Sequence, residues 1–359
     1  MRRKIATLTF ALMASARAAE FNGAEALAFT RRLVAFGPRP SGSEAIRKEQ
    51  AYILSELKAL GCPVMQEDFT GTTPLGPTPM KNIIARFAGS SGKIVVITGH
   101  YDTKSMPLTL FVGANDGGSS AAFLLEMAKA LAGGARKDEV LLVWFDGEEA
   151  VGQWSDYDSL YGSRHLADRW SADGTLARIK ALINVDMIGD RDLDILKDLN
   201  SSAPLRELVW SVADRLGYGK HFLRYDSSIE DDHIPFLRRG INALDLIDLN
   251  YGPGNSYWHT DKDTVDKLSA ESFQIVGRVV METLKELERE DGADGRDHRR
   301  REAGGLDVAR RRKQATADRE YTQGRPPGDA RSDGDRSAAA GHRPRHAPGA
   351  VLHAQREGL

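Results

Sequence analysis

Two adjacent carboxylates carry the clearest chemical signal in this chain. Glu148 and Glu149 stand in the segment DGEEA, directly after the apolar run Val140–Phe145. That run predicts a buried strand. Because neighbouring side chains on an extended backbone point in opposite directions, one carboxylate could hold a metal while the other faces a substrate as a general base. Two bare carboxylates this close repel, so the pair requires a cation or a shared proton. Taken alone, such a pair could also be a solvated acidic turn.

Further candidate ligands follow other predicted strands in the same way. His100 ends a β-branched run, Asp116 stands just before a predicted helix, Asp186 ends another apolar run, and His259 lies in a loop after a strand. In open α/β sheets, ligands bind outside the carboxyl ends of the strands, so these residues and Glu149 are expected at one edge. A set of imidazoles and carboxylates without a thiolate suits catalytic zinc, with one position open for water or substrate.

Each of these residues also has an ordinary explanation. A lone histidine after a strand is more often a hydrogen-bonding loop residue, Asp116 could cap a helix, and Asp186 could cap a turn before Gly189. The repetition of the strand-then-ligand pattern, together with the glutamate pair, is much harder to explain in that way. The constellation as a whole therefore predicts an intact metal site.

The order of these residues resembles the zinc aminopeptidase superfamily, which includes the glutaminyl cyclases (glutaminyl-peptide cyclotransferases). The resemblance covers about Ala24 to Glu290. Three segments are similar to the cyclase branch in particular, and they separate it from ordinary aminopeptidases better than the shared metal ligands do. These segments are DGEEAVGQWSDYDSLYGSRHLA (Asp146–Ala167), DDHIPFLRRG (Asp231–Gly240) and WHT (Trp258–Thr260).

The resemblance implies a metal set. One zinc ion would be held by the residues matching Asp116, Glu149 and His259. In the di-zinc aminopeptidases, the position of Asp186 binds a second metal together with that of His100. Both of these residues are present here and in cyclases, so the sequence leaves open whether one or two zinc ions bind.

The resemblance also implies roles in catalysis and substrate binding. Glu148 matches the general acid/base, and Asp186 matches an acid that helps to bind the substrate amine. Asp231 matches a further acid of the same hydrogen-bond network. Trp154 and Trp258 match aromatic residues that line the pocket, although ordinary packing is the alternative explanation for both.

Three functions follow as hypotheses. A glutaminyl cyclase would convert the N-terminal glutamine of peptides or proteins to pyroglutamate, with Glu148 moving a proton from the substrate amine to departing ammonia. A zinc aminopeptidase would instead hydrolyse the first peptide bond, with Glu148 activating water. A non-catalytic binding module could use the same fold, but the presence of the general base and of every ligand position argues against it. The oligomeric state stays open.

The sequence predicts an α/β fold with three layers. From Lys93 onward strands alternate with helices, which indicates a mostly parallel central sheet with helices on both faces. The early strands would make the sheet mixed, and a Pro/Gly-rich loop is expected between them. The segments outside this alternation are predicted helices over Glu25–Phe36, Glu44–Leu60 and Ser269–Glu290, and predicted strands over Val64–Phe69 and Asn82–Phe87.

Three regions differ in composition. Residues 1–19 combine a basic start, an apolar stretch and a small-residue cleavage pattern, which predicts a signal peptide and a periplasmic or secreted protein; a disordered cytosolic N-terminus is the alternative. Residues 20–290 form the expected catalytic domain. No later segment has the length of a membrane span, and the single Cys62 excludes an internal disulfide.

The third region, residues 291–359, is rich in Arg, Gly, Asp, Pro and Ala and has almost no bulky apolar residues. Such a segment cannot bury enough apolar surface to offset its ordering entropy, so disorder is expected. Acidic residues are interspersed among its arginines, so no nucleic-acid role is predicted. Its excess of arginine over lysine, unlike the preceding domain, suggests a shifted reading frame in GC-rich DNA.

Overall fold

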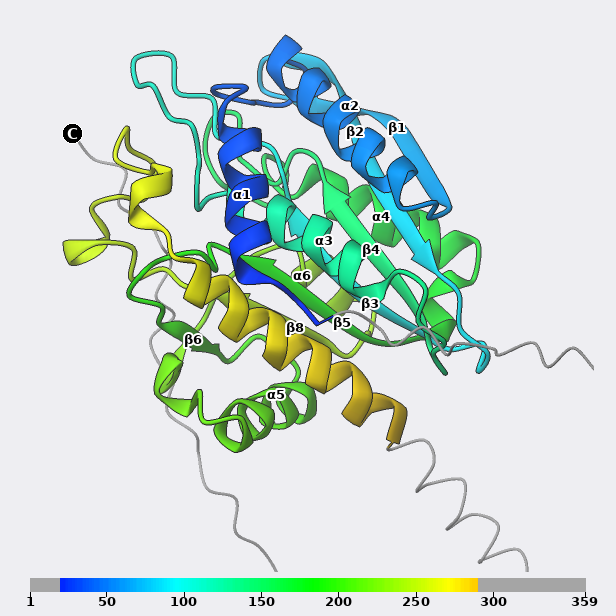
Figure 1. The fold of residues 1–359 in the computed structure, drawn as a ribbon. Coiled ribbons are helices and arrows are strands. Elements are labelled where there is room, and N and C mark those ends of the chain that lie inside the picture. Colours follow the sequence, from blue (N-terminus) through cyan, green and yellow to red (C-terminus); the bar gives the residue numbers. More distant parts are fainter. Residues whose placement is uncertain (1–19, 290–359) are drawn as a thin grey trace, which may run out of the picture. The chain divides into compact units, whose positions relative to one another are not determined.

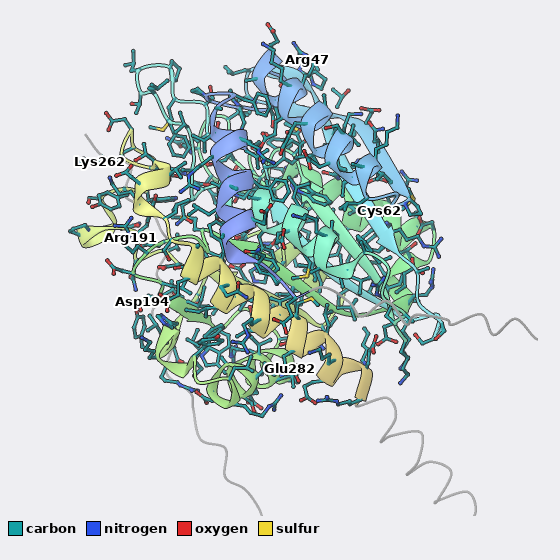
Figure 2. The ribbon with its side chains drawn as sticks, viewed as in Figure 1. Arg47, Cys62, Arg191, Asp194, Lys262 and Glu282 are labelled. Atoms are coloured by element: carbon teal, nitrogen blue, oxygen red, sulfur yellow. The ribbon has the colours of Figure 1, made fainter. Side chains whose placement is uncertain are left out.

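The computed structural model describes residues 20–289. The expected signal peptide (1–19) and the low-complexity tail (291–359) therefore lie outside the described residues. Within residues 20–289, no helix combines the length and the apolar character that crossing a membrane requires. Cys62 is free and half-buried, and it lies just before the first residue of β1 (Figure 2).

A mixed sheet of six strands forms the centre of the fold (Figure 1). Its order is β1-β2-β4-β3-β5-β8, with β1, β2 and β4 paired antiparallel and β4, β3, β5 and β8 paired parallel. A separate pair of parallel strands consists of β6 (Ile195–Asp198) and β7 (Phe222–Ser227). The strands of the central sheet are β1 (Val64–Thr73), β2 (Gly76–Phe87), β3 (Ile94–His100), β4 (Glu139–Phe145), β5 (Ile179–Asp186) and β8 (Ala243–Ile247).

Helices cover both faces of this sheet, as the sequence predicted. On one face, Phe145 of β4 packs in an apolar cluster with Trp170 of α4 (Tyr161–Ala172) and Phe236 of α6 (Ile234–Leu237). On the other face, the indole of Trp144 donates a hydrogen bond of 3.0 Å to a backbone carbonyl of α3 (Gly118–Leu131). With both faces covered, every residue of β3 and β4 is buried, which is why Ile94–Ile97 and Val140–Phe145 form continuous apolar runs within them. Burying one such large side chain contributes about 1.5–3 kcal/mol.

The first two helices begin at residues whose side chains cap the helix N-terminus. The side chain of Asn22 accepts hydrogen bonds from the first turn of α1 (Gly23–Val34), and Ser43 does the same for α2 (Glu44–Ala59). Because Asn22 is the cap, α1 begins two residues before the predicted Glu25. The other helices are α5 (Ala203–Arg215), the helix over 270–289, and the short 3-10 helices η1 (Thr175–Arg178), η2 (Gly219–His221), η3 (Pro253–Asn255) and η4 (Val265–Lys267).

The prediction of a Pro/Gly-rich loop between the first two strands is wrong. β1 and β2 instead form one long hairpin that turns between Thr73 and Gly76. Pro77 and Pro79 are tolerated because this half of β2 pairs with β1 only, since β4 joins β2 from Ile83 onward. A proline lacks the N–H that a strand with partners on both sides must donate, but a strand paired on one side has room for it.

Candidate metal centre and active site

The fold brings the candidate ligands to one edge of the sheet. His100 is the last residue of β3, and Asp186 is the last residue of β5. Glu148 and Glu149 follow the end of β4 by three and four residues. Since β3, β4 and β5 run parallel, their carboxyl ends lie together. Asp116 does not cap α3, because the capping position is Gly117, which makes no side-chain hydrogen bond.

One group of ligand atoms consists of Asp116, Glu149 and His259, which lie within 4.8 Å of one another. His259 Nε2 lies 3.1 Å from Asp116 Oδ2 and 3.1 Å from Glu149 Oε1. The backbone of His259 has a φ of 51°, an uncommon conformation for a residue other than glycine. Its ring is held between Trp258, which stacks on it, and Phe111, which meets it edge-on.

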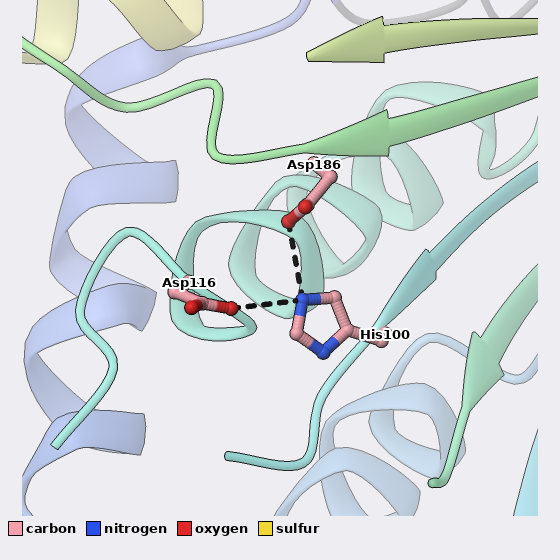
Figure 3. A group of neighbouring side chains, drawn as sticks. All are labelled: His100, Asp116 and Asp186. Carbon is pink, nitrogen blue, oxygen red and sulfur yellow. Dashed lines mark hydrogen bonds and ion pairs between the residues drawn. The ribbon is translucent and has the colours of Figure 1, made fainter. Parts of the chain in front are cut away.

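A second group consists of His100, Asp116 and Asp186, again within 4.8 Å. Figure 3 shows both carboxylates directed at the same ring nitrogen of His100, with Nε2 at 3.1 Å from Asp186 Oδ1 and 3.3 Å from Asp116 Oδ1. Asp116 therefore belongs to both groups and turns one oxygen to each. The structure assembles the residues expected for one metal and also those expected for a second.

The buried carboxylates of these two groups place several negative charges close together, which favours a bound cation. Burial alone would lower the pKa of His259, but the carboxylates of Glu149 and Asp116 outweigh it and raise the pKa to about 10. The pKa of His100 is also raised against its burial, by Asp186 and Glu148. Two buried polar atoms, Asp116 Oδ2 and His100 Nδ1, make no well-formed hydrogen bond, although charged neighbours lie 3.1 Å and 3.5 Å from them. A donor set of buried carboxylates, the buried imidazole of His100 and the half-buried imidazole of His259 fits zinc.

Glu148 lies outside both ligand groups. Its Oε2 atom is 3.8 Å from His100 Nδ1. Burial raises the pKa of its carboxyl well above the usual range, and the negative charges of Glu149 and Asp231 add to this effect, while His100 opposes it. A buried carboxyl with a raised pKa can both accept and return a proton near neutral pH.

Asp102 fixes the backbone that carries the glutamate pair. Its Oδ1 accepts a hydrogen bond of 3.1 Å from the N–H of Glu148, and its Oδ2 accepts one of 3.3 Å from the N–H of Glu149. This role of Asp102 could not be predicted from the sequence. In the sequence, its only distinguishing feature is its position two residues after His100. In the structure, His100 Nδ1 lies 3.5 Å from Asp102 Oδ1.

Asp263 fixes the backbone of the loop that carries Asp116. Its Oδ1 accepts hydrogen bonds from the N–H of Asn115 at 2.8 Å and from the hydroxyl of Tyr251 at 2.7 Å, and its Oδ2 accepts one from the N–H of Asp116 at 3.1 Å. Asp263 is fully buried. Sequence reasoning missed it, because the segment DKD around it has the composition of a solvated charged turn.

The remaining expected residues are Asp231, Trp154 and Trp258, and of these Asp231 and Trp258 lie near the two ligand groups. Asp231 is buried, and its pKa is raised to about 6 by burial and by the negative charge of Asp186, against the opposing effect of His233. Trp154 is 38% exposed and lines a surface hollow with Leu160, and neither Glu148 nor any candidate metal ligand lines that hollow. Trp258 is half-buried beside His259.

A model of peptidase family M28 matches residues 82–284. That stretch contains every candidate residue described above, from His100 to Asp263. The chain is 32% identical over 271 residues to a glutaminyl-peptide cyclotransferase of Drosophila melanogaster, with 67% of this chain and 76% of the relative covered. The chain belongs to peptidase family M28, in its glutaminyl-peptide cyclotransferase branch.

Solved structures agree with this membership. A glutaminyl cyclase of an Acidobacteriales bacterium is 40% identical, with a TM-score of 0.74 over 79% of this chain and all of that chain. A Zn-dependent exopeptidase from Parabacteroides distasonis is 30% identical, with a TM-score of 0.67 over 74% of this chain and 99% of that one. The M28 fold of this chain is thus similar both to cyclases and to an exopeptidase.

Proposed function

We propose that this protein is a zinc-dependent glutaminyl cyclase that acts on peptides or proteins with an N-terminal glutamine. The observation that carries the proposal is that the neighbouring carboxylates of Glu148 and Glu149 occupy different positions relative to the ligand groups. Glu149 belongs to a ligand group with Asp116 and His259, whereas Glu148 belongs to neither group and is left for proton transfer. The cyclase relatives supply the substrate class.

In this proposal Asp116, Glu149 and His259 hold one zinc ion. When bound, the zinc supplies Lewis-acid chemistry that polarises the side-chain carbonyl of the substrate glutamine. Asp116 turns Oδ2 toward His259 and Oδ1 toward His100, so its two oxygens point to the two ligand groups. Pre-formed ligand positions of this kind reduce the reorganisation that metal binding requires.

Glu148 moves the proton. The substrate's own α-amine attacks the side-chain carbonyl carbon, so a new C–N bond closes the ring and the bond to the side-chain nitrogen breaks. Glu148 accepts a proton from the attacking amine and donates it to the departing nitrogen, which leaves as ammonia. Its raised pKa suits both halves of this transfer.

The other residues hold the substrate. Asp186 and Asp231 would accept hydrogen bonds from the substrate amine, and Trp154 and Trp258 would form apolar walls. The reaction consumes no water, so walls that exclude water favour cyclisation over hydrolysis. Positioning matters strongly, because the glutamine side chain must fold back onto its own amine.

A zinc aminopeptidase is the second candidate, and one observation favours it. The ligand group of His100, Asp116 and Asp186 is complete, so the chain has the residues for a second metal. In that case Asp186 would bind metal and not the substrate amine, and Glu148 would activate a water molecule.

We further propose that residues 1–19 direct export, which would make the protein periplasmic or secreted. This proposal rests on the basic start and apolar stretch of that segment. N-terminal glutamines exposed on exported peptides would then be its substrates.

One experiment separates the two enzymatic candidates. Purified protein is incubated with two peptides that differ only in an N-terminal Gln or Leu, and the products are weighed by mass spectrometry. A cyclase removes the mass of one ammonia from the Gln-peptide and leaves the Leu-peptide intact. An aminopeptidase removes a whole residue. Release of free leucine, with the Gln-peptide uncyclised, would overturn the cyclase proposal, and the Glu148→Gln variant serves as the inactive control.

A further inference from the structure

Asp158 uses its carboxylate to hold three consecutive backbone N–H groups. Oδ1 accepts a hydrogen bond of 2.9 Å from Val151, and Oδ2 accepts bonds of 2.7 Å from Gly152 and 3.0 Å from Gln153. The carboxylate sits directly against this backbone, because a Cβ added at Gly152 would lie 3.1 Å from Oδ2. The next residue in the chain is Trp154, so Asp158 fixes the loop from which this indole projects.

The carboxylate is itself fixed in place. The hydroxyl of Tyr161 donates a hydrogen bond of 2.8 Å to Asp158 Oδ1. The backbone N–H of Asp158 bonds to Ser155, both to its carbonyl at 3.2 Å and to its hydroxyl at 3.1 Å. Asp158 is only 6% exposed. Four donors converge on one buried carboxylate, so its orientation is strongly determined.

The segment that contains Asp158 is joined at its other end to the backbone of the candidate general base. The N–H of Leu160 donates a hydrogen bond of 2.8 Å to the carbonyl of Glu148, and the N–H of Tyr161 donates one of 2.7 Å to the carbonyl of Gly147. Residues 158–161 therefore bridge the turn of Glu148 and the loop of Trp154. Asp158 supplies the bonds at the Trp154 end of this bridge.

We propose that Asp158 is a positioning residue that sets Trp154 relative to Glu148, and that it thereby determines how tightly the pocket fits the N-terminal side chain of the substrate. The inference rests on the proposed roles of Trp154 and Glu148. Asp158 does not touch the substrate; it acts through the loop of residues 151–153. A displacement of about 1 Å in such a supporting group can lower turnover by roughly 10²-fold.

A double-mutant cycle tests this role. The variants are Asp158→Asn, Trp154→Ala and the combination of both, compared by kcat/KM on whichever N-terminal substrate the wild type turns over. Asparagine keeps the size of the side chain but replaces one acceptor oxygen by a donor. If Asp158 acts through Trp154, Asp158→Asn should lower kcat/KM by about 10²-fold in the wild-type background. With alanine at position 154, the same change should cost less than about 3-fold, because the group being positioned is gone.

Zinc content and thermal unfolding are measured for all four proteins, and zinc should be retained in each. Asp168→Asn, which alters an exposed aspartate on α4 that pairs with Arg239, is the matched control and should leave kcat/KM unchanged. Equal losses from Asp158→Asn in both backgrounds would overturn the inference, because a merely structural role adds independently of Trp154. If Asp158→Asn does not fold, Tyr161→Phe removes one of the four donors and is put through the same cycle with the same criterion.

Failure of the inference and failure of the proposed function give different results. A wild-type enzyme that releases leucine would contradict the cyclase proposal but would still allow the cycle to be measured on that substrate. Additive losses in an enzyme that cyclises Gln-peptides would contradict the inference alone.

Discussion

Trp258 stacks on the ring of His259, with the ring centroids 4.1 Å apart and an angle of 24° between the planes. The two residues are adjacent in sequence, and the backbone of His259 has a φ of 51°. The expected pocket wall therefore lies in direct contact with an expected metal ligand. A change at Trp258 should affect both the fit of the substrate and the orientation of the imidazole.

The first prediction concerns this stack. Trp258→Ala removes both the wall and the stacking surface, so kcat/KM for Gln-peptides should fall by about 2- to 13-fold from the lost stack alone, since an aromatic pair contributes about 0.5–1.5 kcal/mol beyond its buried area. Zinc should be retained, because no ligand atom is lost. Trp258→Phe keeps an aromatic face and should recover most of the activity. Steady-state kinetics and metal analysis check this pair, and full activity of the alanine variant would exclude Trp258 from the pocket.

The second prediction concerns the metal. Glu149→Gln and His259→Ala each remove a ligand from the group that includes Asp116. Both variants should lose zinc and activity together, with the remaining carboxylates unable to hold the ion. Metal content after dialysis, measured by elemental analysis, tests this. Glu207→Gln, an exposed change on α5, is the control. Full zinc occupancy in both variants would contradict the assignment of Glu149 and His259 as zinc ligands.

Much of this site could be predicted from the sequence, because each ligand follows a local signal. A β-branched run ends at His100, and an apolar run precedes Glu148 and Glu149, so strand periodicity and the rule for parallel sheets place these side chains at one edge. The same rules predicted helices on both faces of a mixed sheet. Local patterns were sufficient for His100, Asp186 and the glutamate pair, which lie at or shortly after strand ends, whereas Asp116 and His259 lie in longer loops.

The residues that hold these ligands in place could not be predicted. Asp263 bonds to the backbone of Asp116 across 147 residues, and Asp102 bonds to that of Glu148 across 46. Nothing in the composition of their own segments distinguishes them from solvated aspartates. The hairpin of β1 and β2 was missed for a related reason, because the prolines of β2 are acceptable only where its partner strand on one side is absent.

The third prediction concerns the general base. Glu148→Gln should keep the fold and the zinc but lower kcat by roughly 10²–10⁴-fold, the usual contribution of acid–base catalysis. The glutamine cannot accept the amine proton. Near-normal turnover would rule Glu148 out of this role, and Glu207→Gln again serves as the control.

A pH dependence follows from the same residue. Glu148 must be ionised to accept a proton, so activity should fall as the pH drops through its pKa. Because burial raises that pKa, the acidic limb of the kcat profile should lie closer to neutral pH than the value of about 4.3 for an ordinary glutamate. The residual activity of Glu148→Gln should lack this limb. Zinc content measured across the same pH range separates loss of the base from protonation of the ligand imidazoles.

The last prediction concerns Asp263, which ties the Asp116 loop to Tyr251. Asp263→Asn replaces one acceptor oxygen by an amide that cannot accept from a backbone N–H, so the loop should shift and Asp116 should lose its fixed direction. Loss of such an outer partner usually weakens metal affinity or activity by about 10–100-fold. Competition with a chelator measures the zinc affinity directly. Asp266→Asn, an exposed aspartate three residues later, should leave the affinity unchanged. Wild-type zinc affinity in Asp263→Asn would show that Asp116 keeps its position without this buried carboxylate.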